Sequence, residues 1–337
     1  MNGAESLIRT LIAGGIEVCF ANPGTSEMHL LAALDQVPGI RSVLGLFEGV
    51  VTGAADGYAR MAGKPAITLL HLGPGLANGL ANLHNARRAR SPVVNIVGEH
   101  ATHHQGLASP LETDLEAVAR PFSDWVRTAR TPAEVGRAAA DAIAAARTAP
   151  GRIATLILPG DAAWNQGGEP VLTPPPVSAP APVPAPRIEA VAKLLRSGAP
   201  CLLFMSGVAL GEAGLAAAGR IAAETGALQL AQMSNARLER GAGRVPIDRL
   251  RYPVDQALEQ LAGIRHVILV GTREPVAFFA YPGKPSRLAP EGAAIHRLAG
   301  PEDDLVGALE ELADRVGAPR QARRSGTSSR RRCRAVP

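Results

Sequence analysis

The sequence has few aromatic residues, few cysteines and no long apolar run. Aromatic side chains make up 3% of the 337 residues although 46% are hydrophobic, so small side chains must fill much of the core. The three cysteines, Cys19, Cys201 and Cys333, form no CxxC pair, and the first two lie in apolar segments. This pattern is typical of core thiols in a reducing compartment, so we expect a cytoplasmic protein. We also expect no signal peptide and no membrane association.

Acidic residues are missing from the last part of the chain. Residues 318–337 contain seven arginines and no acidic residue, while the whole chain has a formal net charge of +5. Without these seven arginines the net charge of the rest of the chain is 5 − 7 = −2. The basic character therefore comes from the end of the chain, and we expect no nucleic-acid groove in the folded part. The segment 319–337 has no periodicity, so we expect it to be disordered. Its arginine-rich composition is typical of a shifted reading frame or a truncation.

Short apolar runs alternate with helical patterns in two blocks of the chain. Eight prolines between residues 170 and 186 predict an extended linker between the blocks. Alternation of this kind predicts two doubly wound, mostly parallel α/β domains at residues 1–168 and 187–318, joined by the linker 169–186. The predicted strands are 16–20, 42–47, 66–72, 93–98, a strand near 125, 153–159, 201–205, 227–231, 266–271 and a strand near 294.

Glu48 follows the short apolar run 42–47, which we interpret as a buried strand, and precedes a helical segment. Glycines recur there at every fourth position, Gly49, Gly53 and Gly57, and therefore share one helix face. Because glycine lowers helix stability, such a face indicates close approach of another backbone, as at a subunit contact. Glu48 itself is either a glutamate favoured by the helix dipole or a buried catalytic acid.

Polar groups gather where predicted strands end, and ligands of doubly wound sheets bind at those ends. His71 precedes Gly73-Pro74-Gly75 and is either a hydrogen-bonded core histidine or a proton-handling group. Thr25 either caps a helix or faces a ligand. The histidines of the loop 98–106 either lie in a solvated loop or at the rim of an active site. They lack the further ligands of fixed geometry that a metal site needs, so we expect no metal there.

The chain resembles the thiamine diphosphate-dependent enzymes of the acetolactate synthase and benzoylformate decarboxylase group. The resemblance covers about residues 1–318 and is strongest over 1–165, which is similar to the family's pyrimidine-binding domain. It rests on four motifs in family order, which are NPGTSE (22–27), FEGVVTGAADGYAR (47–60), HLGPGLANGLANLHNARRARSP (71–92) and DAAW (161–164).

The resemblance implies roles for particular residues. Glu48 matches the glutamate that hydrogen-bonds N1′ of the aminopyrimidine, and His71 matches a histidine that handles protons in benzoylformate decarboxylase. The cofactor-binding residues implied are Glu48, Gly73, Pro74, Gly75 and Asn78; the substrate-facing candidates are Thr25, His71 and His104.

The resemblance stops before the family's third domain. That domain carries a GDG motif and paired asparagines and binds the diphosphate through Mg²⁺, whereas this sequence contains no GDG. The segment 271–286 departs from the arginine- and aspartate-rich pattern of FAD-binding relatives, so FAD is not expected. The resemblance therefore implies thiamine diphosphate with Mg²⁺ as cofactor, a 2-oxo acid as substrate, and a homodimer or homotetramer.

Three functions follow as hypotheses. The first is a carboligase of acetolactate synthase type, present as an incomplete chain that is inactive alone. The second is a benzoylformate decarboxylase-like enzyme. The third is a non-catalytic fragment that dimerises with or regulates a relative.

Overall fold

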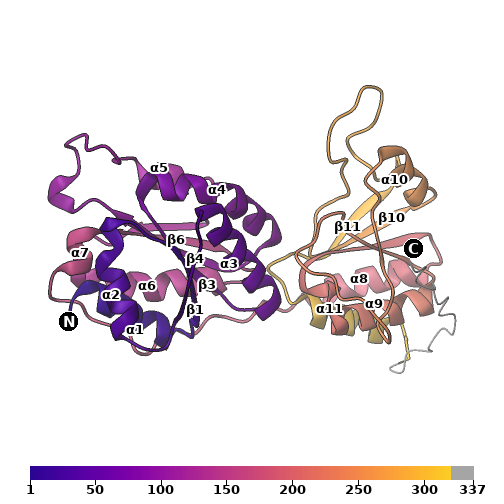
Figure 1. Ribbon diagram of the computed structural model, residues 1–337. Helices are drawn as coiled ribbons and strands as arrows, with labels where there is room; N and C mark the ends of the chain where they lie inside the picture. Colours follow the sequence, from indigo (N-terminus) through magenta and orange to yellow (C-terminus); the bar gives the residue numbers. More distant parts are fainter. Residues whose placement is uncertain (320–337) are drawn as a thin grey trace, which may run out of the picture. The chain divides into compact units, whose positions relative to one another are not determined.

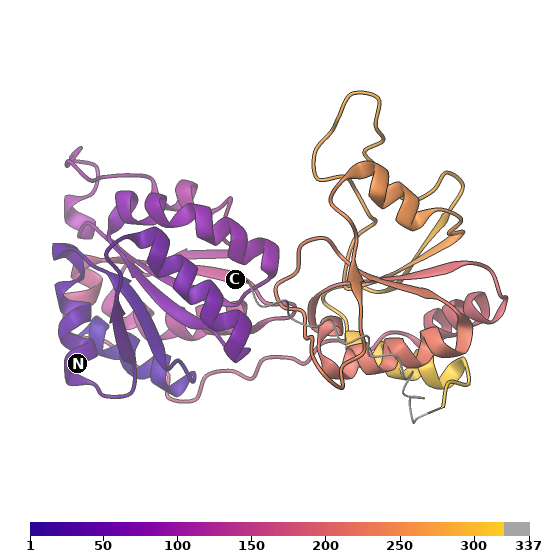
Figure 2. The same ribbon diagram turned by 45° about the vertical axis from the view of Figure 1, so that its right-hand side comes forward.

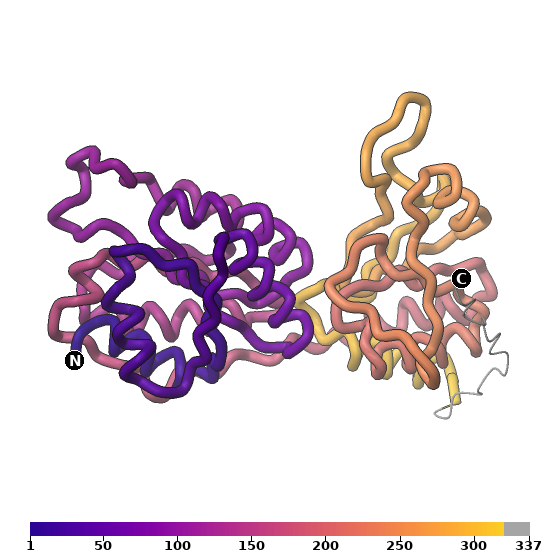
Figure 3. Tube along the Cα trace, in the orientation of Figure 1, coloured from indigo at the N-terminus to yellow at the C-terminus, as the bar shows by residue number. Residues whose placement is uncertain are grey.

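The computed structural model describes residues 1–319, which divide into two units (Figures 1 and 3). The first unit contains Met1–Ala181 with the short segments Ser234–Leu238 and Pro301–Asp303. The second contains Pro182–Met233, Glu239–Gly300 and the described residues from Asp304 onward. Cys333 and the arginine-rich segment from residue 320 onward lie outside the described residues.

The first unit is built on a parallel six-stranded sheet in the order β2-β1-β3-β4-β6-β5. Its strands are β1 (Val18–Asn22), β2 (Arg41–Leu44), β3 (Ala66–Leu70), β4 (Val93–Glu99), β5 (Trp125–Thr128) and β6 (Ile153–Pro159). One face is covered by α1 (Gly3–Ala13), α2 (Met28–Gln36), α6 (Pro132–Arg147) and α7 (Gly160–Trp164). The other face is covered by α3 (Glu48–Ala62), α4 (Leu72–Ala89) and α5 (Leu115–Ala119) (Figure 2).

Small side chains fill the core of the first unit, as the aromatic-poor composition predicts. The central strands β3, β4 and β6 are buried along their whole length, which explains their continuous apolar runs. Helix α6 begins with Pro132, whose missing N–H costs nothing at that position, and its buried face consists mainly of alanine. Short side chains let this helix lie close to the sheet.

The second unit has a parallel five-stranded sheet in the order β11-β10-β7-β8-β9. Its strands are β7 (Cys201–Met205), β8 (Leu228–Ala231), β9 (Asp248–Arg249), β10 (His266–Val270) and β11 (Ala294–Ala299). Helices α8 (Ala185–Arg196), α9 (Glu212–Thr225) and α11 (Leu305–Arg315) lie on one face, and α10 (Val254–Leu261) lies on the other. Short 3₁₀ helices occur at Thr25–Glu27 (η1), Thr102–His104 (η2) and Gly207–Leu210 (η3).

The doubly wound fold class is confirmed, and Cys19 and Cys201 are buried as expected. The predicted buried strand 42–47 is wrong, because β2 ends at Leu44 and forms the edge of the sheet. Its neighbours Leu46 and Phe47 are 90% and 50% exposed. The two-residue strand β9 was not predicted, since it is too short to show periodicity. Among residues 1–319, no helix combines the length and apolarity needed to cross a membrane.

Candidate functional site

Four neighbouring strands of the first unit place the predicted site segments at one edge of the sheet. In the order β2-β1-β3-β4, the strands lead into α3, η1, α4 and the loop 100–114. All four strands are parallel, so these connections start at the same carboxyl edge. The NPGTSE segment, Glu48, His71 and the histidine loop therefore come together as expected for a doubly wound sheet.

Glu48 is the first residue of α3, where the helix dipole favours a carboxylate. Its Oε2 accepts a hydrogen bond from Asn78 Nδ2 at 3.0 Å. A Cβ at Gly75 would lie 3.4 Å from Glu48 Oε1, so this glycine keeps the space beside the carboxylate open. The expectation that Glu48 is buried is wrong: the residue is half-buried because the neighbouring edge of the sheet is uncovered.

Close packing of α3 against α4 fixes the position of Glu48. Thr52 donates its hydroxyl to the carbonyl of Gly79 at 3.0 Å, and Asn82 donates to the carbonyl of Gly49 at 2.7 Å. A Cβ at Gly53 would lie 3.0 Å from the Asn82 amide. Gly49 and Gly53 thus have close neighbours within the same chain, and the proposed subunit contact of the glycine face stays a prediction.

His71 forms a pair with a carboxylate that the sequence analysis did not identify. Its Nδ1 lies 2.8 Å from Oε2 of Glu27, whose side chain is fully buried. The same oxygen accepts the N–H of Gly24 at 2.7 Å. Burial raises the pKa of Glu27, although the hydrogen bonds from Gly24 and His71 act in the opposite direction.

Two glycines make room for this pair. A Cβ at Gly24 would overlap the His71 ring, and a Cβ at Gly98 on β4 would overlap the Glu27 carboxylate. Oε1 of Glu27 is buried beside Gly98 without a hydrogen-bond partner. The signal that could have identified Glu27 is its place three residues after Gly24, because a carboxylate there can accept the Gly24 N–H.

Thr25 does not cap a helix. Gly24 is the N-cap of η1, and Glu27 performs the capping. Thr25 is exposed on η1, at the carboxyl edge of the sheet. Its role toward a substrate therefore stays a prediction, whereas its interpretation as a cap is wrong.

The sequence predicts a strand that reaches residue 72 and a loop at Gly73-Pro74-Gly75. This prediction is wrong. Strand β3 ends at Leu70 and helix α4 begins at Leu72, so the three residues lie in the first helical turn. Proline is favoured at this end of a helix. A Cβ at Gly73 would overlap Thr113, so the loop after β4 lies directly over this turn.

The loop 100–114 is held by polar contacts, although His103 and His104 are exposed to solvent. Thr102 donates both its backbone N–H and its hydroxyl to Asp161 of α7. Oε2 of Glu112 accepts the N–H of Ser109 at 3.3 Å, and His100 Nε2 lies 3.0 Å from the Ser109 hydroxyl. The loop is therefore anchored at its start and braced across its middle.

His104 is exposed, and its ring lies 5.5 Å from the ring of His100. No described contact joins His104 to Glu48 or His71, so its substrate role stays a prediction. Glu99, at the end of β4, is a second buried carboxylate that the sequence analysis missed. Burial raises its pKa, although its own carboxylate accepts the N–H of His100. Its signal was its place at the end of a strand.

The described residues fit one end of thiamine diphosphate. The Glu48 carboxylate, held by Asn78 and bordered by Gly75, offers an acid or acceptor beside open space, which suits the pyrimidine ring. Within residues 1–319, no group of three or more histidine, cysteine, aspartate or glutamate side chains has the arrangement of a metal site. The described residues therefore do not show a place for Mg²⁺.

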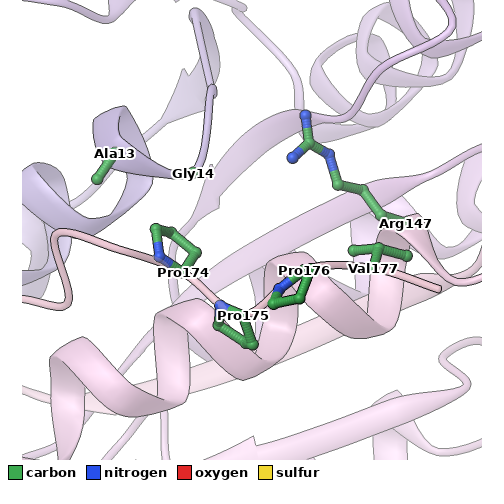
Figure 4. A pocket seen from close by; sticks show the side chains of 7 residues that line it. All are labelled: Ala13, Gly14, Arg147, Pro174, Pro175, Pro176 and Val177. Carbon is green, nitrogen blue, oxygen red and sulfur yellow. The ribbon is translucent and has the colours of Figure 1, made fainter.

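A groove of about 530 Å³ lies elsewhere on the first unit (Figure 4). It is lined by the end of α1, by Arg147 at the end of α6 and by the proline segment 174–177. Helix ends that precede a strand lie at the amino edge of a parallel sheet. The groove is thus separate from the Glu48 and His71 edge.

The fold and the site together define a doubly wound α/β protein with two carboxylates, Glu27 and Glu48, near the strand ends. Residues 1–119 match the family model described as the thiamine pyrophosphate enzyme N-terminal domain that binds thiamine pyrophosphate. Residues 1–119 thus carry the N-terminal domain of the thiamine pyrophosphate enzymes, which confirms the resemblance found in the sequence.

The relatives differ in how much of the chain they match. A Mycobacterium tuberculosis protein named provisionally as acetolactate synthase large subunit IlvX is 53% identical over 97% of this chain and 63% of its own length. Benzoylformate decarboxylase of Pseudomonas aeruginosa is 34% identical over 45% of this chain and 28% of its own length.

The solved structure of a thiamine diphosphate-dependent 4-hydroxybenzoylformate decarboxylase from Rhodococcus jostii RHA1 is similar in fold. Its TM-score is 0.80 at 23% identity, and the match covers 94% of this chain and 62% of that one. The chain thus spans less than two thirds of the length of the M. tuberculosis protein and of the R. jostii decarboxylase.

Proposed function

We propose that the chain supplies the pyrimidine-binding half of a thiamine diphosphate-dependent enzyme that acts on a 2-oxo acid. The observation that carries this proposal is the Glu48 carboxylate at the start of α3, fixed by Asn78 through one oxygen. The other oxygen borders Gly75 and is free to exchange a proton with N1′ of the pyrimidine. When bound, thiamine diphosphate supplies the carbon nucleophile and the electron sink for decarboxylation.

The leading reaction is carboligation of acetolactate synthase type, in which one 2-oxo acid is decarboxylated and its acyl unit is transferred to an acceptor. The similarity to the M. tuberculosis protein, over nearly the whole of this chain, supports this choice. The substrate and the acceptor belong to the proposal. In this reaction Glu48 exchanges the proton at N1′, and Thr25 and His104 face the substrate.

A second candidate is simple decarboxylation of a 2-oxo acid, and the His71–Glu27 pair favours it. Because Nδ1 of His71 is held by Glu27, its Nε2 is the nitrogen that can exchange a proton with a ligand. A proton delivered to the carbon that has lost CO₂ leads to release of an aldehyde. Carboligation requires that an acceptor reacts at this carbon before a proton does. The pair therefore supports proton transfer as an alternative outcome at the same site.

The diphosphate and Mg²⁺ need oxygen ligands, and the described residues provide no such cluster. We therefore propose that residues 1–337 alone bind the cofactor weakly and do not turn over a 2-oxo acid. If a chain supplied with a diphosphate-binding domain is also inactive, the remaining hypothesis is a non-catalytic fragment that dimerises with or regulates a relative.

The test uses this chain and a chimera in which the part of the M. tuberculosis relative beyond the match is joined to residue 318. Each protein is titrated with thiamine diphosphate and Mg²⁺ by calorimetry and then incubated with pyruvate or benzoylformate. We expect turnover by the chimera alone, with acetolactate as product for carboligation and an aldehyde for decarboxylation. Turnover of either substrate by the isolated chain would contradict the proposal that it lacks a diphosphate site.

Self-association is proposed through the exposed apolar residues around the start of α3. Leu46 is 90% exposed, Leu44 is 69% exposed and Val50 is 60% exposed. Adjacent exposed apolar side chains of this size are typical of a protein contact. Sedimentation at micromolar concentration should show a dimer in the wild-type chain and a monomer in Leu46→Asp. A monomeric wild-type chain would contradict the proposal.

A further inference from the structure

Two histidines meet on the sheet of the second unit, away from any residue assigned above. His266 begins β10 and His296 lies in the middle of β11. Nδ1 of His266 is 3.1 Å from Nε2 of His296, and the ring centroids are 5.2 Å apart. The pair thus brings two ring nitrogens together at the edge of the sheet.

The register of the two strands explains the pair. In this parallel pairing, His266 is opposite Ala294 and Ile268 is opposite His296. Residues opposite each other share a face, and so do residues two apart on one strand. The two rings are therefore diagonal neighbours, and the small Ala294 side chain leaves space beside them. Because β11 is an edge strand and both histidines are only half-buried, water reaches the rings.

The separation of the two nitrogens suits a shared transition-metal ion. With metal–nitrogen bonds of about 2.0 to 2.1 Å, two nitrogens on one ion lie roughly 2.9 Å apart at a right angle and 3.4 Å apart at a tetrahedral angle. The observed 3.1 Å falls between these values.

We propose that His266 and His296 bind one divalent ion of the borderline class, such as Zn²⁺, with water completing its coordination. Imidazole suits Zn²⁺, Ni²⁺ and Cu²⁺, whereas Mg²⁺ prefers oxygen ligands. Cys201 lies opposite His266 on β7 and faces the same way, but burial raises the pKa of its thiol. It is therefore not counted as a ligand, in keeping with the finding that residues 1–319 contain no three-ligand group. The ion would tie the edge strand β11 to β10.

The test titrates the full chain with Zn²⁺ and, separately, with Mg²⁺ by calorimetry in a non-chelating buffer. We expect one Zn²⁺ per chain at this pair, no heat from Mg²⁺ there, and a rise in melting temperature with Zn²⁺. Loss of a ligand should weaken Zn²⁺ binding by about tenfold or more in His266→Ala and in His296→Ala. The control variant replaces His103 and His104 by alanine, which removes two other histidines and leaves this pair intact.

A second measurement does not depend on how the variants fold. Cu²⁺ bound to the wild-type chain should show coupling to two imidazole nitrogens in its electron paramagnetic resonance spectrum. The proposal is overturned if the His103 and His104 variant loses the Zn²⁺ site while His266→Ala keeps it. It is equally overturned if the wild-type chain takes up no Zn²⁺ at micromolar concentration, since the two rings would then form only a hydrogen bond.

Discussion

The two units have sheets of the same kind but differ at the carboxyl edge of those sheets. In the first unit, glycines at this edge make room for charged side chains: Gly98 faces Glu27, and Gly75 borders Glu48. In the second unit, the strand order reverses between β7 and β10, where sheets of this kind often bind nucleotides. A Cβ at Gly271 there would lie 2.5 Å from Leu305 and 2.8 Å from the carbonyl of Ser206.

The fold alone therefore does not make a site. A glycine in the first unit leaves space for a carboxylate, whereas a glycine in the second unit leaves space for an apolar side chain of the core. Both edges are the carboxyl ends of parallel strands, so the side chain that fills the space beside each glycine decides whether the edge can do chemistry.

The largest effect is expected from Glu48→Gln in the chimera with the M. tuberculosis segment. The amide keeps the shape of the carboxylate and the contact with Asn78 but cannot exchange a proton at N1′. We expect turnover to fall by a factor of about 10² to 10⁴, with an unchanged melting temperature. Glu17→Gln, an exposed substitution just before β1 and so at the amino edge of the sheet, serves as the control. Retained activity in Glu48→Gln would remove the assigned role of this residue.

A large effect on stability is expected from Gly98→Ala. Its added methyl group would overlap the carboxylate of Glu27, which is fully buried. We expect the free energy of unfolding to fall by about 1 to 3 kcal/mol in urea denaturation. If Gly98→Ala is as stable as the wild-type chain, the close fit between β4 and Glu27 is wrong.

A smaller, pH-dependent effect is expected from Glu27→Gln. Because the pKa of Glu27 is raised in the folded chain, its contribution to stability is present below the unfolded pKa and is lost as the pH rises through the folded pKa. The neutral amide removes this loss. The difference in unfolding free energy between Glu27→Gln and the wild-type chain should therefore shift in favour of the variant from pH 4 to pH 7. A constant difference over this range would contradict the raised pKa.

The smallest effect is expected from Gly57→Ala on α3. No atom lies within 4 Å of the position of the new Cβ, so the substitution meets no neighbour in the chain. Removing a glycine from a helix interior should stabilise the chain by about 0.5 to 1 kcal/mol, measured by urea denaturation. The opposite sign from Gly98→Ala would separate a glycine needed for space from one that is not. Destabilisation by Gly57→Ala would show that this face is covered in solution.

The alternation of apolar runs and helical patterns was enough to predict two doubly wound sheets. Long segments such as 132–147 were located because their periodicity is strong. The site was predicted in part: Glu48, Asn78 and Gly75 do lie together. The sequence analysis missed the pairing of Glu27 with His71, because the place of Glu27 three residues after Gly24 indicates a contact with the Gly24 N–H but none with a residue so far along the chain.

The sequence by itself determined the fold class, the family and the placing of polar motifs at strand ends, because each depends on local spacing along the chain. Only the tertiary structure decided that Glu27 backs His71 and that β2 lies at an exposed edge. It also decided that Gly53 of α3 lies against Asn82 of α4. These features depend on which strands and helices become neighbours, and that order is set by packing between residues far apart in the chain.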